Sequence, residues 1–186
     1  LAQESSEVAD FWSMLQGFQT SGKCVDKAHY RIRYMKSFRP ISVKEDIEFK
    51  EARPILYLNM AAVASLFNSR NMNATANRSN WSTIMSYLKS HSSFLGLKQD
   101  RFTILLPSGL PDYSFEMVNN EQVKKVKVNR PKALCFDYLQ LKEAFGLELE
   151  TEIISDKQEV MEDNLTGQEP SNVQIQGFPS QRDLPL

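Results

Sequence analysis

The sequence has few of the residues from which metal centres and disulfide frameworks are built. Its 186 residues include two cysteines, Cys24 and Cys135, and two histidines, His29 and His91. The cysteines are far apart and lack Cys-x-x-Cys spacing, so two free thiols in a reducing compartment are favoured over one disulfide, which the sequence leaves open. A site of several histidines would need carboxylates as further ligands. We therefore expect neither a metal nor a cofactor.

Long apolar runs are also missing. No stretch of about 18 apolar residues occurs, so no transmembrane helix is expected and we expect no membrane partner. The first 30 residues carry acidic side chains and no long apolar segment, which argues against a signal peptide. The expected location is therefore cytoplasmic.

Catalytic motifs are absent as well. The chain has seven glycines and contains no Gly-x-x-x-x-Gly-Lys-Ser/Thr, Gly-x-Gly-x-x-Gly, Gly-x-Ser-x-Gly or His-Glu-x-x-His motif. A dyad of Cys24 and His29 is conceivable, but Cys24 follows a glycine turn and His29 lies on the polar face of an expected strand. The acids are scattered, and an undetected hydrolase would need them clustered in a pocket. We expect a domain that is not an enzyme.

The charge is divided unevenly along a chain whose formal net charge is −1. Residues 1–138 carry six more basic than acidic residues, whereas residues 139–186 carry seven more acidic than basic ones. A basic body with an acidic tail suggests a polyanionic partner. The alternative is a solvated surface followed by a flexible tail.

The apolar spacing predicts alternating helices and strands. A helix is expected over residues 5–18, followed by a strand in which Tyr30 and Ile32 face the core while Arg31 and Arg33 face solvent. The second half predicts a strand at 55–60 and a helix after it, then a helix from 81 that ends in a turn at Gly96. Strands at 102–106 and 133–138, which are expected to pair with each other, flank an elongated hairpin whose turn is expected within residues 119–122, and a short helix is expected at 139–147.

Two helices followed by a long hairpin are the arrangement of a winged helix-turn-helix. We therefore expect an α+β fold, with a winged-helix-like domain at 54–150. An N-terminal helix and strand segment, 1–53, would pack on it, and an acidic flexible tail would occupy 151–186.

A winged helix binds DNA with small polar side chains on its second helix and with cations on its hairpin. The candidate nucleic-acid-binding residues, on the helix, beside it and on the hairpin, are Arg78, Thr83, Ser86, Tyr87, Lys89, Ser90, Lys98, Lys124, Lys125 and Lys127. The alternative for the hairpin lysines is that they keep an exposed strand soluble.

Three segments also resemble a known family. "ILYLNMAAVASLFNSRN", "SYLKSHSSFLGLKQDRF" and "KALCFDYLQL" are similar to the C-terminal module of primase–helicase proteins encoded by phages and mobile elements of Bacteroidetes. The similar positions are Ile84, Tyr87, Leu88, Lys89, Phe94, Leu95, Gly96, Arg101, Phe102, Phe136, Asp137 and Tyr138. "FWSMLQGF" resembles the segment that joins this module to the ATPase core.

The resemblance covers about residues 8–145 and implies a fold more than an activity, because most similar positions are apolar. The ATPase and primase motifs are missing, so those activities are not implied. It implies an accessory, non-catalytic domain of a DNA replication protein that binds single- or double-stranded DNA. The alternative is a protein–protein interaction or oligomerisation domain, without DNA contact, that binds the helicase or primase core or itself through exposed residues such as Leu110 and Tyr113.

Overall fold

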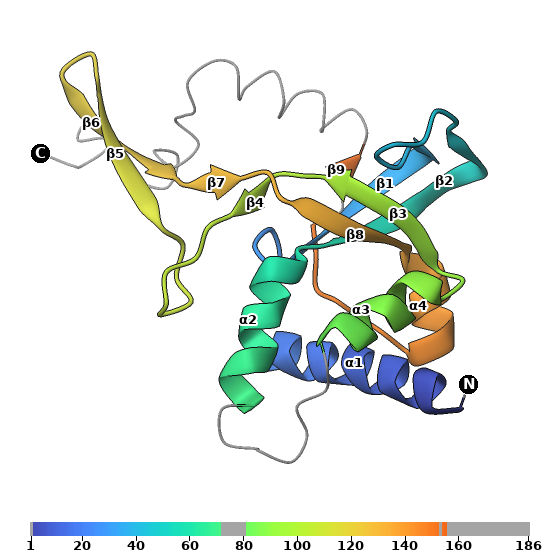
Figure 1. Cartoon of the computed structure of the whole chain (residues 1–186). Helices are drawn as coiled ribbons and strands as arrows, with labels where there is room; N and C mark the ends of the chain where they lie inside the picture. Colours follow the sequence, from blue (N-terminus) through green and yellow to red (C-terminus); the bar gives the residue numbers. More distant parts are fainter. Residues whose placement is uncertain (1, 72–80, 153, 156–186) are drawn as a thin grey trace, which may run out of the picture.

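In the part of the chain that the structure describes, residues 2–71, 81–152 and 154–155, four helices lie on one face of a five-stranded sheet (Figure 1). The structure is a computed structural model. Apolar residues of all four helices and of the strands β1, β2 and β8 form one buried cluster between the two layers. The fold is therefore α+β, as the sequence predicts.

The helices are α1 (Ala2–Thr20), α2 (Met60–Asn71), α3 (Trp81–Ser90) and α4 (Tyr138–Phe145). The strands are β1 (Tyr30–Phe38), β2 (Ile47–Leu58), β3 (Phe94–Gln99), β4 (Phe102–Thr103), β5 (Tyr113–Val118), β6 (Glu121–Val126), β7 (Val128–Asn129), β8 (Lys132–Asp137) and β9 (Ile154–Ser155).

The large sheet has the strand order β3-β8-β2-β1-β9. Its neighbours are antiparallel except for β9, which runs parallel to β1. The expected domain boundary between residues 53 and 54 falls inside β2, which pairs with β1 on one side and with β8 on the other. The N-terminal segment and the following domain therefore share one sheet and one core.

Aromatic side chains fill the core beneath the helices. Trp12 of α1 meets Phe136 of β8 edge to face, with ring centres 5.1 Å apart, and Phe11 stacks on Phe67 of α2 at the same distance. These side chains are almost fully buried, and each contributes about 1.5–3 kcal/mol to the free energy of unfolding. The helical spacing of Val8, Phe11, Trp12, Leu15 and Phe18 is what allowed α1 to be predicted.

The sheet face turned away from the helices holds a second apolar cluster that includes Tyr57, Phe102 and Cys135. Arg33 lies on this face and donates to both carboxylate oxygens of Asp100, at 2.7 and 2.5 Å. We expected Arg31 and Arg33 to face solvent, but they are 5% and 3% exposed. The prediction was wrong because strand alternation identifies only one buried face, and here both faces of β1 are covered.

Gly96 corrects another prediction. It does not end a helix but lies within β3, at an irregularity in the pairing with β8. Its φ is +135°, and a Cβ atom there would lie 2.6 Å from Cβ of Pro40. Ile41 donates its N–H to the carbonyl of Leu97 beside this contact. Glycine is required because the β1–β2 loop approaches the backbone of β3 closely.

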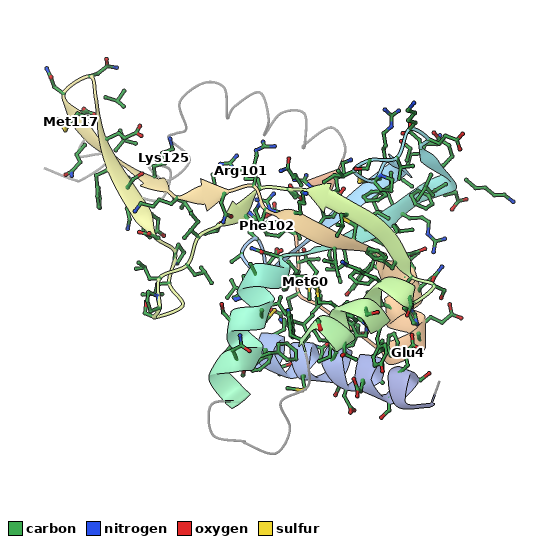
Figure 2. The ribbon with its side chains drawn as sticks, viewed as in Figure 1. Glu4, Met60, Arg101, Phe102, Met117 and Lys125 are labelled. Atoms are coloured by element: carbon green, nitrogen blue, oxygen red, sulfur yellow. The ribbon has the colours of Figure 1, made fainter. Side chains whose placement is uncertain are left out.

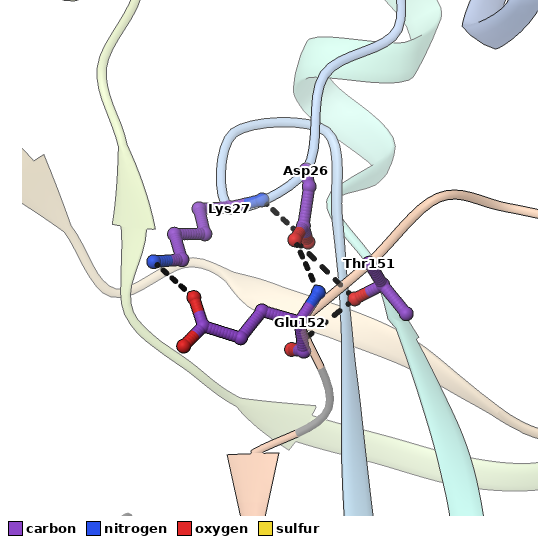
Figure 3. Close-up of polar contacts among 4 residues, drawn as sticks. All are labelled: Asp26, Lys27, Thr151 and Glu152. Carbon is purple, nitrogen blue, oxygen red and sulfur yellow. Dashed lines mark hydrogen bonds and ion pairs between the residues drawn. The ribbon is translucent and has the colours of Figure 1, made fainter.

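The segment after α4 packs on the body of the fold beyond residue 150, where we expected the tail to begin. Leu147 and Leu149 are buried in the main core. The carboxylate of Asp26 accepts one hydrogen bond from the backbone N–H of Glu152 and one from the hydroxyl of Thr151 (Figure 3). Lys27 pairs with the carboxylate of Glu152 at 3.4 Å, and β9 follows. The rest of the predicted tail, residues 156–186, lies outside the described residues.

Both cysteines are free thiols buried in different apolar clusters.

None of the described helices combines the length and the apolar character that a membrane span requires.

Candidate interaction site

A two-stranded ribbon leaves one end of the large sheet (Figure 1). The pairing of β3 with β8 is continued by β4 with β7 and then by β5 with β6, all antiparallel. We call residues 102–129 the arm. Its root is attached to the body through Phe102, which is fully buried, and through the N–H of Thr103, which donates to the carbonyl of Lys27 at 2.8 Å. The elongated hairpin predicted from the sequence is therefore an appendage that projects from the sheet.

The tip of the arm is a two-residue turn. Asn119 and Asn120 have φ values of +50° and +66° between β5 and β6. A pair of positive φ angles is typical of a type I′ hairpin turn, and asparagine tolerates this backbone conformation better than most residues. Nearer the base, residues 104–112 form a side loop, closed by hydrogen bonds that include Asp112 N–H to the carbonyl of Ile104 at 2.9 Å.

One face of the arm is apolar and exposed. Tyr113, Phe115 and Met117 alternate along β5 and so share a face. Phe115 is 59% exposed and Met117, labelled near the tip in Figure 2, is 69% exposed. Ten large hydrophobic side chains are exposed in the described part of the chain, and half of them lie on the arm. A projecting hairpin cannot bury its own side chains, and such a patch is typical of a contact surface.

The predicted phosphate-binding lysines of the arm already have intramolecular partners. Lys125 lies 3.6 Å from the carboxylate of Glu116, and Lys127 lies 3.2 Å from that of Asp112. The ammonium group of Lys124 lies 3.8 Å from the centre of the Tyr113 ring. The arm contains three lysines and three acidic residues and no arginine, so its formal net charge is zero.

The predicted groove-facing residues are on α3, far from the arm hairpin (Figure 1). α3 packs on α1 and on the sheet, with Ile84 and Leu88 buried. Tyr87 is half-buried against the main core, and the hydroxyl of Ser90 contacts the carboxylate of Glu4 on α1. Thr83, Ser86 and Lys89 lie on the same helix, with Thr83 half-buried and Ser86 and Lys89 exposed.

The remaining predicted site residues lie elsewhere. Lys98 is on β3, where its ammonium group lies 5.3 Å from the centre of the Phe38 ring. Arg78 is outside the described residues. The structure therefore brings Lys124, Lys125 and Lys127 together on the arm, and it does not bring them together with the predicted residues of α3.

A cleft of about 550 Å³ lies at the base of the arm, between α2 and the side loop. We call it the base cleft. It is lined by Lys23, Ala28, His29, Asn59, Ala61, Ala62, Ser65, Leu66, Thr103, Ile104, Leu105, Leu106, Pro107, Gly109, Asn129 and Pro131. Most of this lining is apolar, and the polar groups are few, which is the usual composition of a binding pocket.

Two buried polar side chains line the base cleft. His29 is 4% exposed, and its Nδ1 accepts the N–H of Val25 at 2.9 Å, which places the proton of the neutral ring on Nε2. Burial lowers the pKa of His29. Asn59 is 5% exposed and donates from Nδ2 to the carbonyl of Ala28 at 3.0 Å, while its Oδ1 has no hydrogen-bond partner among the described residues. Oδ1 of Asn59 is itself shielded from solvent, so this acceptor lies behind the lining of the cleft and is not presented to it.

The sequence gives little indication of this cleft. Asn59 comes just before α2 and its carbonyl accepts the N–H of Val63, but its side chain reaches back to the loop before β1. His29 reads as a solvent-facing residue of a strand. The two come together because residues 25–29 pack against the start of α2, a contact between segments about 30 residues apart in the sequence.

The described residues do not assemble a reactive group from Cys24 and His29. Burial, and to a smaller extent the charge of Asp26, raises the pKa of Cys24 to about 12, so its thiol stays protonated. Nδ1 of His29 is engaged by a backbone N–H. No group of three or more histidine, cysteine, aspartate or glutamate side chains suited to a metal ion occurs among the described residues.

No protein-family model, curated protein or solved structure matches the chain. The arm and the base cleft are therefore the features from which a function can be inferred.

Proposed function

We propose that the chain is a non-catalytic protein-interaction domain that binds another protein surface through its arm. The observation that carries the proposal is the apolar face of β5, on which Phe115 and Met117 are exposed and Tyr113 is half-buried. Removing such side chains from water on binding yields about 25 cal/mol per Å² of buried apolar surface, before the costs of association are subtracted. Aromatic residues and methionine are also enriched at protein interfaces.

The charges of the arm support a protein partner over a nucleic acid. Binding to phosphates requires protein cations that neutralise the phosphates and so displace the counterions of the nucleic acid. On the arm Lys125 and Lys127 each face a carboxylate, and the three lysines are balanced by three acids. The expectation of DNA binding therefore remains a prediction with less support than the protein alternative. The same holds for the winged-helix assignment, since α2, α3 and the hairpin have its order but α3 packs on α1.

The resemblance to primase–helicase modules suggests which assembly to examine. In such a protein the arm would bind the helicase or primase core, or another copy of the chain. This context belongs to the proposal, as do the intracellular location and a role in replication.

The test is a photoreactive benzoylphenylalanine placed at position 115 in the whole protein, irradiated in cells that produce it. The control places the same residue at Val43, which is 47% exposed on the loop between β1 and β2, away from the arm. We expect protein adducts from position 115 and few from position 43. Adducts with nucleic acid, or equal yields at both positions, would contradict the proposal.

A further inference from the structure

We infer that the base cleft binds a small molecule that carries a carboxylate on an apolar chain or ring. The cleft is separate from the apolar face of β5, so this inference goes beyond the proposed function and does not depend on it. The cleft lies between α2 and the side loop of the arm and has a volume of about 550 Å³. This volume is in the usual range for small-molecule pockets, about 300–1,000 Å³.

The polar group that a ligand can reach is Nε2 of His29. Nδ1 of this ring accepts the N–H of Val25, whereas Nε2 carries the proton and has no hydrogen-bond partner among the described residues. Unlike Oδ1 of Asn59, Nε2 is not sealed from solvent, and the small exposed part of His29 belongs to a side chain that lines the cleft. A largely buried donor without a partner is costly, and a ligand that supplies an acceptor removes this cost.

The charge of the lining favours an acceptor that is anionic. Lys23 is the only charged side chain among the described residues that line the cleft, and they include no aspartate or glutamate. Lys23 is exposed and makes no ion pair within the described part of the chain. A carboxylate in the cleft can accept the N–H of His29 while it is attracted by the ammonium group of Lys23. A hydrogen bond to an ionised acceptor is stronger than one between neutral groups.

The rest of the lining selects an apolar body. Leu66 contributes from α2, and Ile104, Leu105 and Leu106 contribute from the side loop. Leu106 is 42% exposed, so part of this wall is in contact with water that an apolar ligand would displace. A nucleotide or a sugar would place its own polar groups against these side chains, which is unfavourable.

The first test is a titration of the 186-residue chain with octanoate, below its micelle-forming concentration, followed by calorimetry and by NMR of the histidine ring nitrogens. The chain has two histidines, and His91 is outside the cleft lining and serves as an internal reference. We expect saturable binding that shifts the Nε2 signal of His29 and leaves the ring signals of His91 in place. Octylammonium, which has the same chain and the opposite charge, should bind at least about tenfold more weakly.

Substitutions of the two polar groups test the recognition of the carboxylate. His29→Asn retains an acceptor for the N–H of Val25 and removes the Nε2 donor, so the octanoate dissociation constant should rise about tenfold. Lys23→Gln should raise it by about threefold to fivefold, because the cation is exposed. Lys44→Gln, at an exposed position outside the cleft lining, is the control and should leave it unchanged.

A substitution that fills the cleft tests the location, and it keeps the test valid if His29→Asn does not fold. Ser65→Trp, at an exposed position of α2 that lines the cleft, should abolish saturable binding of octanoate. Asn68→Trp, at an exposed position of the same helix outside the cleft lining, should leave the binding unchanged.

Three results would overturn the inference: no saturable binding of octanoate to the unmodified chain at millimolar concentration, equal affinity for octylammonium, or octanoate binding that survives Ser65→Trp. The proposed function fails or stands separately. Cross-linking from position 115 is measured without octanoate, and its failure would leave the octanoate titration unaffected.

Discussion

The ammonium group of Lys124 lies 3.8 Å from the centre of the Tyr113 ring, on the same face of the arm as Phe115. A cation over an aromatic ring is held by the electron-rich face of that ring. The charge of Lys124 is thus set into an apolar surface of its own chain. Together with the ion pairs of Lys125 and Lys127, this contact leads us to expect binding through side-chain burial, with modest dependence on salt.

Replacing Asp100 should destabilise the fold strongly. Its carboxylate accepts two buried hydrogen bonds from Arg33 and a third, part-buried, from the N–H of Arg101 at 2.7 Å. Asp100→Ala removes the counter-charge of a guanidinium that is 3% exposed, which costs about 3–5 kcal/mol of unfolding free energy. Urea denaturation measures this loss of unfolding free energy. The matched control is Asp46→Ala, which breaks the exposed pair with Arg39 and should not shift the midpoint.

Gly96→Ala should also be destabilising, through the backbone. An added Cβ would lie 2.6 Å from Pro40, and the φ of +135° is unfavourable for alanine. We expect a loss of roughly 1–3 kcal/mol in thermal or urea denaturation. Gly17→Ala is the control, because Gly17 lies inside α1 with nothing within 4 Å of an added Cβ, and it should gain about 0.5–1 kcal/mol. Equal effects at the two sites would contradict the close approach of the β1–β2 loop to β3.

Stability should fall in mild acid because of His29. Burial lowers its pKa below the usual 6.5, so the unfolded chain binds a proton on this ring at a higher pH than the folded chain does. The contribution of the neutral His29 ring to stability is complete above about pH 6.5. As the pH falls from there toward the pKa of the folded chain, the free energy of unfolding decreases by up to about 1.4 kcal/mol per pH unit. Urea denaturation between about pH 7.5 and 5.5 should show this slope, and His29→Asn should flatten it. A slope unchanged in His29→Asn would show that the proton binds elsewhere.

The thiols of Cys24 and Cys135 should be unreactive in the folded chain. Burial raises the pKa of both, and only the thiolate attacks a disulfide reagent. Ellman's reagent should modify neither cysteine in native buffer and both in denaturant. The control is Ser108→Cys, an exposed position on the side loop of the arm, which should react at once. Rapid labelling of native Cys24 would contradict the packing of residues 18–30.

Periodicity predicted elements whose apolar residues recur on one face. α1 follows from the spacing of Phe11, Trp12 and Leu15, and β1 from the alternation of Tyr30 and Ile32. The residue types of 119–122 predicted a turn there, and the structure has it at Asn119–Asn120. These features depend on neighbours within a few positions, so the sequence contains the information needed to find them.

Features that depend on distant partners were not predictable. The burial of Arg33 requires Asp100, which is 67 residues away. The strand at Gly96 forms by pairing with β8, and Pro40 leaves no room there for a side chain. The expected pairing of residues 102–106 with 133–138 is replaced by pairing of Phe102 and Thr103 with β7, while β8 pairs with β3. The candidate site shows the same limit, since the lysines of the arm were identified but their carboxylate partners and their distance from α3 were not.

The most direct test of the account is cross-linking from a photoreactive residue at position 115 in two further backgrounds. One carries Met117→Ser, which weakens the apolar face, and the other carries Lys125→Gln with Lys127→Gln, which removes two charges of the arm. The account predicts that the yield of protein adduct falls in the first background and persists in the second. An adduct that persists without Met117 and disappears without the two lysines would contradict it and return the arm to nucleic-acid binding.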